Sequence, residues 1–282
     1  MKPSARPERL LTAKLILVGC GHMGRPFLEG WLERGVEARH VTVVEPDAGL
    51  GVALKKDNGI TVHQSPETIA MDLDPDAVVL AVKPQIMDSV VPAYRRFSGS
   101  RTVFLSIAAG RTLAYFERHL GDQAIVVRSM PNLPATVSRG VTVACPNARV
   151  TPEQRRLCHN LLESVGQAAW VDDETLLDAV TALSGNGPAY VFLLVECLAN
   201  AGIAAGLPED LAQHLARETV SGAGELLRRS PHPPEVLREN VTTPGGTTAA
   251  AMEILMAQEG LGDLMTRAIA AAARRSREFG GE

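Results

Sequence analysis

The chain has few cysteines, and their spacing builds neither a metal site nor a disulfide framework. Cys20, Cys145, Cys158 and Cys197 are the only four. None belongs to a CxxC pair, and no histidine stands at metal-ligand spacing from them. The sequence therefore predicts no bound metal and no disulfide-rich secreted domain, and it favours a reducing compartment such as the cytoplasm.

Positive charge is also scarce. The 28 Lys and Arg are outnumbered by 32 Asp and Glu, which gives a formal net charge of -4 and no basic field to attract nucleic-acid phosphates. The first residues, MKPSARPERLLTAK, contain no apolar run of signal-peptide length. The longest apolar stretch, 188–206, carries Glu196 and Asn200, which suits a buried core helix better than a membrane span. We expect no nucleic-acid partner and no membrane partner.

Short β-branched segments alternate with helix-length segments through the first half of the chain. The predicted strands are 14–19, 40–45, 60–63, 76–82, 102–107, 124–129, 141–145 and 168–171, with helices at 24–34, 84–96 and 112–119 and another that begins at Thr151-Pro152. Continuous apolar strands are typical of a parallel sheet covered by helices on both faces. The alternation predicts a right-handed, doubly wound sheet.

The composition changes after Asp172. Alanine, leucine and glycine dominate, strand signals disappear, and helix starts recur at Pro188, Pro208, Pro234 and Thr247. The predicted fold is α/β: an N-terminal Rossmann-type dinucleotide-binding domain at 1–171 is followed by an all-helical domain at 172–282. Small residues in ECLANAGIAAG indicate closely packed helices in this second domain.

A glycine-rich loop joins the first predicted strand to the first predicted helix. Its sequence GCGHMG comprises Gly19, Cys20, Gly21, His22, Met23 and Gly24. In this strand-turn-helix context the pattern predicts a dinucleotide site. We expect Gly19 to form the tight turn, Gly21 to admit the pyrophosphate and Gly24 to allow close helix–strand packing. A glycine-rich turn without a ligand is the structural alternative.

Glu45 ends the second predicted strand, where an acidic side chain accepts hydrogen bonds from an adenosine ribose. Its carboxylate would repel a 2′-phosphate, and no arginine follows closely. The sequence therefore favours NADH over NADPH, although Lys55 and Lys56 could partly compensate. A solvated acid at a strand end is the alternative.

Several motifs together resemble one enzyme family. They are AVKPQ (81–85), SIAAG (106–110), MPNLPA (130–135), DAVTALSGNGPAYVF (178–192), AGIAAGLP (201–208) and VTTPGGTTAAAMEIL (241–255). The set resembles pyrroline-5-carboxylate reductase from about Lys14 to Glu278. The resemblance implies reduction of L-1-pyrroline-5-carboxylate to L-proline by NAD(P)H, the last step of proline biosynthesis, in a homo-oligomer built from dimers.

The resemblance also implies further contacts with the cofactor. The residues concerned are Ser65, Ala81, Val82, Lys83, Pro84, Ala108, Ala109 and Gly110. For Lys83, a structural or cofactor-binding role is favoured over that of an acid.

The VTTPGGTT segment predicts the substrate site independently of the resemblance. Pro244-Gly245-Gly246 forces a turn before a helix that begins at Thr247, and free amides there suit a carboxylate. Thr243 and Thr247 belong to the same predicted site. Thr248 is the predicted catalytic residue, because its hydroxyl could hydrogen-bond the ring nitrogen. A purely structural Gly-Pro turn is the alternative.

Two departures from the family pattern concern the substrate. Asn186, a further predicted substrate contact, stands where the family usually has serine, and SPHPP (230–234) is unusually rich in proline. Both leave open whether a related cyclic imine carboxylate is the true substrate.

Two other classes of protein remain as rivals. A hydroxy-acid dehydrogenase would need a lysine base on its helical domain, and 172–282 contains no lysine. A dinucleotide sensor without turnover would not need the second anion site in PGGTT. No side chain in the substrate loops is an obvious acid, so solvent or an already protonated imine is left as the proton source.

Overall fold

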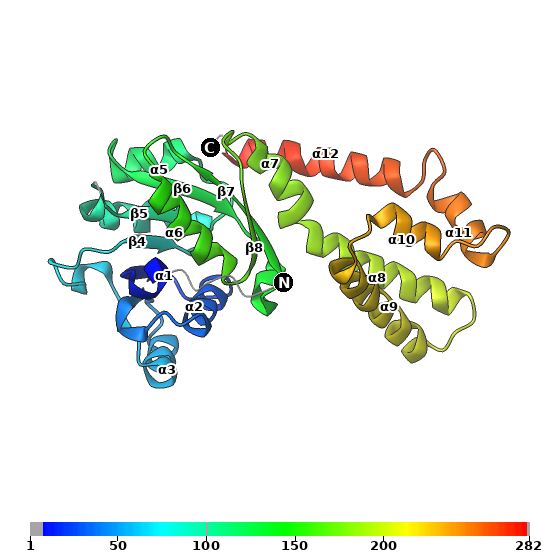
Figure 1. Cartoon of the computed structure of the whole chain (residues 1–282), viewed down its shortest axis with the longest axis horizontal. Helices are drawn as coiled ribbons and strands as arrows, with labels where there is room; N and C mark the ends of the chain where they lie inside the picture. Colours follow the sequence, from blue (N-terminus) through cyan, green and yellow to red (C-terminus); the bar gives the residue numbers. More distant parts are fainter. Residues whose placement is uncertain (1–7, 100, 281–282) are drawn as a thin grey trace. The chain divides into compact units, whose positions relative to one another are not determined.

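The computed structural model describes residues 8–99 and 101–280. The chain forms two compact units (Figure 1). One contains the residues up to Gly185 together with those from Ala273 onward, and the other is Asn186–Ala272.

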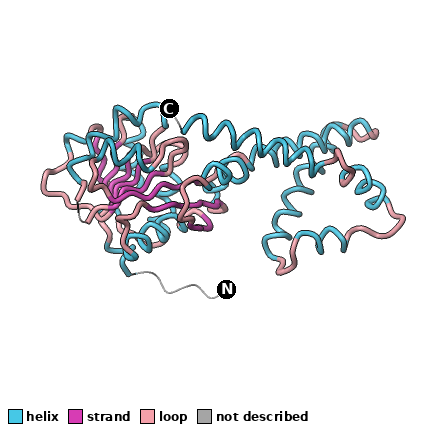
Figure 2. The backbone as a smooth tube through the Cα atoms, turned by 90° about the horizontal axis from the view of Figure 1, so that it is seen from above, coloured by secondary structure: helices cyan, strands magenta, loops and turns pink. Residues whose placement is uncertain are grey.

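The first unit is built on one sheet with the strand order β3-β2-β1-β4-β5-β6-β7-β8, seen in magenta in Figure 2. The strands are β1 (Leu15–Val18), β2 (Val41–Val44), β3 (Thr61–His63), β4 (Ala77–Leu80), β5 (Val103–Ser106), β6 (Ile125–Met130), β7 (Gly140–Pro146) and β8 (Gly166–Trp170). Every predicted strand is present. Strands β1 to β6 are mutually parallel, which confirms the doubly wound sheet for this part of the chain.

Strand β7, for which the sequence predicted no direction, runs antiparallel to β6, and β8 is again parallel to β7. Only residues 131–139 connect β6 to β7, and a 3₁₀ helix at Leu133–Val137 occupies most of them. A parallel pair needs a crossover of a dozen or more residues, so this connection is too short for one.

Helices cover both faces of the sheet. They are α1 (Glu8–Thr12), α2 (Gly24–Glu33), α3 (Ala48–Asn58), α4 (Met87–Val90), α5 (Leu113–Leu120) and α6 (Pro152–Glu163). Alternate strand side chains serve two cores. Leu15 and Leu17 pack with Trp31 of α2 on one face, whereas Ile16 and Val18 belong to the core of the other face, with α5. The buried apolar surface on both faces stabilises the sheet.

The helix predicted at 84–96 is broken into three pieces. A 3₁₀ turn at Pro84–Ile86 leads into α4, and a second 3₁₀ segment follows at Val91–Phe97. Pro92 lies at the start of that second segment. Because proline has no N–H and its ring clashes with the preceding turn, it disfavours a regular α-helix through this position.

The connection between the two units packs with the sheet. It contains α7 (Leu176–Val180) and a π-helical turn at Thr181–Gly185. The contacts therefore divide the chain at 185/186, whereas the predicted division lies at 171/172. The domain boundary at 171/172 remains a prediction.

The second unit is helical, as predicted. Its helices are α8 (Gly187–Ala204), α9 (Glu209–Arg229), α10 (Pro234–Asn240), α11 (Thr247–Leu255) and most of α12 (Leu261–Gly280). Helices α8 and α9 meet through small residues: Ala199, Ala212 and Ala216 are buried. A Cβ on Gly202 would lie 3.3 Å from Cβ of Ala212. The predicted close packing is confirmed for this pair.

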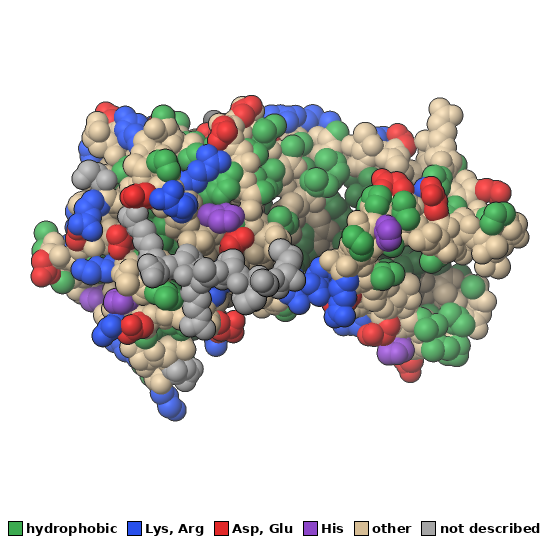
Figure 3. Space-filling view, in the orientation of Figure 1, with side chains coloured by type: hydrophobic (Ala, Val, Ile, Leu, Met, Phe, Trp, Pro, Cys, Tyr) green, Lys and Arg blue, Asp and Glu red, His purple; other side chains and the backbone are tan. Residues whose placement is uncertain are grey.

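The expectation that 188–206 forms a buried core helix is wrong for the single chain. Val191, Phe192, Leu193 and Leu194 of α8 are 44–56% exposed. Figure 3 shows hydrophobic side chains at the surface of this unit. Leu176–Ala204 is long and apolar enough to cross a membrane by length and composition. A single helix of this kind is weak evidence of a membrane span. Apolar helix faces of this kind are also typical of subunit interfaces.

Candidate functional site

The glycine loop lies between β1 and α2, at the carboxyl ends of the parallel strands. Gly19 has a φ of +85°, which permits the tight turn, and its N–H donates to the Val44 carbonyl at 2.9 Å. Helix α2 has Met23 at its N-cap and no side-chain cap. In this first turn the Arg25 N–H donates to the Gly21 carbonyl at 3.0 Å and Pro26 has no N–H, so among the described residues the turn keeps the Gly24 N–H for an anion.

The other two glycines of the motif have opposite surroundings. A Cβ on Gly24 would lie 2.2 Å from the Gly19 carbonyl oxygen and 3.2 Å from Cβ of Ala81. A Cβ on Gly21 would meet no heavy atom within 4 Å. Gly24 therefore permits close helix–strand packing, and Gly21 borders the open space that a pyrophosphate would need. This cradle fits a dinucleotide.

Glu45 lies directly beside this loop. One carboxylate oxygen accepts the Cys20 N–H at 2.8 Å, and the other accepts the Asp47 N–H at 3.1 Å. The side chain is buried. Glu45 thus ties the glycine loop to the end of β2. The sequence did not reveal this structural function.

Cys20 and His22 differ in surroundings although both belong to the loop. Cys20 is buried, and burial together with the charge of Glu45 raises the pKa of its thiol to about 12. The thiol stays protonated at neutral pH and is a poor nucleophile. His22 is exposed. This geometry is compatible with the prediction that both residues contribute to the cofactor site mainly through their backbone.

The loops after β4 and β5 emerge at the same edge. The Ala81 N–H donates to the Val18 carbonyl at 2.8 Å, and Val82 lies against Gly19. Ala108 is buried and Gly110 has a φ of +78°. These loops therefore adjoin the glycine loop.

Two of the predicted cofactor residues lie at the margin of this edge. Ser65 follows β3 and is half-buried, and Lys83 is exposed. Neither makes a side-chain hydrogen bond in the described part of the chain that would assign it a role.

The PGGTT segment forms a turn that leads into α11. The Gly246 N–H donates to the Thr243 carbonyl at 2.9 Å, and Gly245 has a φ of +72°, as a type II turn requires. Gly246 is the N-cap and supplies no side chain to the first turn. Thr247 is exposed and Thr248 is half-buried. The segment has the free amides that a carboxylate would bind.

Asn186 is not brought to this turn within one chain. It is the N-cap of α8, and α11 lies at the other end of the same unit (Figure 1). The predicted substrate residues thus form two groups in the single chain.

Comparisons with known proteins identify the family. A family model described as pyrroline-5-carboxylate reductase dimerisation matches residues 174–279, and one described as NADP oxidoreductase coenzyme F420-dependent matches 14–110. A pyrroline-5-carboxylate reductase from Pseudomonas aeruginosa is 38% identical, over 95% of this chain and 97% of its own length. One from Synechocystis is 36% identical, over 96% and 99%. The chain belongs to the pyrroline-5-carboxylate reductase family.

Solved structures agree with this assignment. A pyrroline-5-carboxylate reductase from Coxiella burnetii superposes with a TM-score of 0.89 at 31% identity, over 95% of this chain and 98% of that one. The enzyme from Plasmodium falciparum, solved with NADP bound, gives 0.78 at 29% identity, over 96% and 99%. The family's dimerisation domain therefore lies in the helical half, where α8 exposes its apolar face.

Sequence reasoning missed a contact between two family motifs. The Asn132 side chain accepts the Val141 N–H at 2.9 Å and donates to the Ser184 carbonyl at 3.3 Å. Ser184 belongs to the π-helical turn, a type of distortion frequent at functional sites. A Cβ on Gly185 would lie 2.4 Å from the methyl group of Met130. The sequence feature that could have indicated this contact is that MPNLPA and SGNGP each follow the end of an element and contain glycine or proline.

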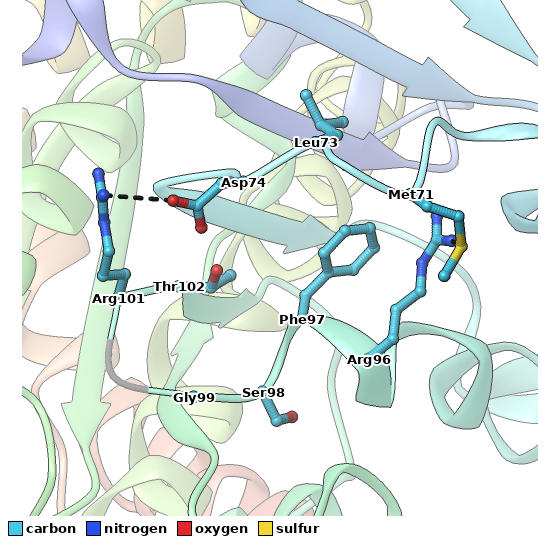
Figure 4. A pocket seen from close by; sticks show the side chains of 9 residues that line it. All are labelled: Met71, Leu73, Asp74, Arg96, Phe97, Ser98, Gly99, Arg101 and Thr102. Carbon is cyan, nitrogen blue, oxygen red and sulfur yellow. Dashed lines mark hydrogen bonds and ion pairs between the residues drawn. The ribbon is translucent and has the colours of Figure 1, made fainter.

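One cavity lies away from these loops. It has a volume of about 270 Å³ and lies among residues that precede β4 and β5, so it opens at the amino ends of the strands. Figure 4 shows Arg101 reaching Asp74 across its rim, at 3.2 Å. Because dinucleotides bind at the carboxyl ends, this cavity is separate from the candidate site.

Proposed function

We propose that this chain reduces L-1-pyrroline-5-carboxylate to L-proline with a nicotinamide dinucleotide, the last step of proline biosynthesis. The observation that carries the proposal is the family match across nearly the whole chain, combined with a glycine loop that has an open cradle at Gly21. The bound nicotinamide would supply the hydride. The protein has to bind both reactants, align them and exclude water.

The chain's own residues divide this work. The first turn of α2 would hold the pyrophosphate, and the turn at Gly245–Gly246 would hold the substrate carboxylate. Thr248, one residue further into α11, would place its hydroxyl at the ring nitrogen and so favour the electrophilic imine. Thr243 and Asn186 are the other polar side chains that we assign to the substrate.

We infer a preference for NADH. The buried Glu45 carboxylate would lie close to a 2′-phosphate and repel it. Burial and the nearby Lys55 lower the pKa of His63, whose carbonyl accepts the Glu45 N–H, so this neighbour of Glu45 carries less positive charge than an ordinary histidine. Both Glu45 oxygens already accept backbone N–H groups, from Cys20 and Asp47. Each oxygen has a second lone pair that a ribose hydroxyl can use.

We also propose that two chains interleave and share each active site, with larger assemblies built from such dimers. The exposed apolar residues of α8 need a partner, and one chain does not bring the two groups of substrate residues together. Each site would then combine the cofactor loops of one chain with the PGGTT turn of the other.

The four cysteines are free, and three of them are buried. Free thiols suit a reducing compartment, which supports the proposal of a cytoplasmic enzyme.

The activity test is oxidation of NADH, followed by its absorbance, on addition of pyrroline-5-carboxylate. We expect turnover and formation of proline. Turnover with a related cyclic imine carboxylate, but not with pyrroline-5-carboxylate, would change the assigned substrate and leave the reaction class unchanged. NADH binding without turnover of any imine would indicate a sensor.

The assembly test uses sedimentation at nanomolar concentration, where a folded and fully active monomer would contradict the proposal. A subunit-mixing experiment tests the shared site. Chains with a blocked glycine loop (Gly21→Arg) are mixed with Thr248→Val chains. Mixed dimers regain one intact site only if the site spans two chains; a site within one chain gives no recovery.

A further inference from the structure

Arg111 follows the loop after β5 and reaches across to the loop after β4. Its Nη2 donates to the Pro84 carbonyl at 3.1 Å and lies 3.4 Å from the carboxylate of Asp88, on α4. The guanidinium carbon lies 4.6 Å from the centre of the Tyr115 ring, on α5. Although it is an arginine, its side chain is only 19% exposed. These contacts hold it over the gap between the two loops.

Tyr115 completes the connection. Its hydroxyl donates to Asp88 at 2.7 Å, and burial together with this hydrogen bond raises the pKa of the phenol. The phenol therefore stays a donor at neutral pH. The Tyr115 ring also packs against the ring of His119, whose centre is 4.2 Å away.

The backbone ladder between β4 and β5 ends at the start of these loops. Its last bond runs from the Ile107 N–H to the Leu80 carbonyl, at 3.1 Å. Beyond it, the hydrogen bonds that join the two loops in the described residues involve Arg111 or Tyr115 with Pro84 or Asp88. Other hydrogen bonds of these loops, from Ala81 to Val18 of β1 and from Ser129 of β6 to Ser106, join each loop to a neighbouring strand and not to the other loop.

We infer that Arg111 is a positioning residue for the cofactor: it fixes the loop at Ala81–Pro84 against the loop at Ser106–Gly110 before the dinucleotide binds. A loop that is already ordered loses less conformational entropy on binding. The inference rests on the proposed function, since it takes these two loops as the cofactor's binding surface. Arg111 acts through the backbone of the loops.

The chain offers a matched control in Arg155. This arginine makes the same pair of contacts far from the loops, with its guanidinium carbon 4.6 Å from the Trp170 ring centre and an ion pair to Asp172 at 3.3 Å. It is part of α6 and reaches the edge strand β8. Arg155→Met therefore removes a cation–π contact and an ion pair without touching a cofactor loop. Its side chain is 40% exposed, against 19% for Arg111.

The experiment measures the Kd of NADH by fluorescence titration without any imine, so its outcome does not depend on which substrate is reduced. We expect Arg111→Met to raise this Kd by about 5- to 20-fold and Arg155→Met to leave it within twofold. Arg111→Lys, whose ammonium can reach one of the two acceptors, should recover part of the affinity. With cofactor and substrate saturating, kcat of Arg111→Met should stay within about twofold.

Hydrogen exchange in the cofactor-free protein gives a second readout. Amides of 81–88 should exchange faster in Arg111→Met than in wild type, and should be unchanged in Arg155→Met. If Arg111→Met does not fold, Asp88→Asn and Tyr115→Phe remove the same connection from its other side. Their combined effect on Kd should be less than additive.

Two results would overturn the inference. One is an unchanged NADH Kd in Arg111→Met, or in both substitute variants. The other is a weakened Kd with unchanged exchange at 81–88, which would mean that Arg111 contacts the cofactor directly. Failure of the proposed function alone would instead appear as normal NADH binding without imine turnover.

Discussion

Nη1 of Arg128 lies 2.8 Å from Oε1 of Glu174, and the same oxygen accepts the N–H of Leu113 at 2.8 Å. The Arg128 side chain is 9% exposed and that of Glu174 is 26% exposed. One carboxylate thus joins the end of β6, the first turn of α5 and the connection to the helical unit. No sequence pattern indicates this pair, because its partners are far apart along the chain.

Glu174→Ala should lower the free energy of unfolding by about 2 kcal/mol. It leaves a buried guanidinium and a backbone N–H without their acceptor, and the partial exposure of Glu174 keeps the loss below that of a fully buried pair. Urea unfolding at a fixed protein concentration measures it. The neighbouring variant Asp173→Ala, at an exposed carboxylate bonded to Thr175, is the control. Equal midpoints for the two variants would show that the pair is not structural.

Gly24→Ala and Gly21→Ala should separate folding from cofactor binding. The Cβ at position 24 would meet a backbone oxygen at 2.2 Å, so we expect a loss of about 1–3 kcal/mol in stability. The Cβ at position 21 enters open space, so stability should stay within about 0.5 kcal/mol. NADH affinity should nevertheless fall, because this Cβ fills the approach of the pyrophosphate. Unchanged NADH binding in Gly21→Ala would place the dinucleotide elsewhere.

Glu45→Gln and Glu45→Ser should both shift preference toward NADPH, by about 5- to 30-fold in the ratio of kcat/KM values, because a repulsive charge is removed. The glutamine oxygen can still accept the Cys20 N–H, whereas the serine is too short to replace it. Glu45→Ser should therefore also weaken binding of both cofactors. Wild-type kcat/KM tenfold higher with NADPH than with NADH would refute the assignment.

Thr248→Val keeps the β-branched shape and removes only the hydroxyl. A hydrogen bond to a charged or charge-developing nitrogen contributes roughly 1.5–3 kcal/mol, so kcat/KM for the imine should fall by about 10- to 150-fold. NADH affinity should not change. Thr266→Val, at an exposed position of α12, is the control for threonine loss in a helix. Wild-type kinetics in Thr248→Val would redirect the search for the nitrogen's partner to Thr243 or Asn186.

Local patterns were enough to predict much of the fold. Apolar β-branched runs fixed the strands, and the glycine spacing from Gly19 to Gly24 predicted a tight turn and a close helix contact that the structure contains. Thr151 forms the predicted N-cap of α6 with a full capping box. Each of these features depends on a few neighbouring residues, so the sequence alone contains the information.

Features that depend on distant partners were decided only by the tertiary structure. The direction of β7 follows from a connection too short for a crossover. The second role of Glu45 depends on an N–H 25 positions earlier, and the reach of Arg111 on a carbonyl 27 positions earlier. A pattern of residue types carries no record of which buried groups meet in space. The sequence predicted that the apolar residues of α8 are buried. In the folded chain they are exposed, so the chain's own helices do not cover them.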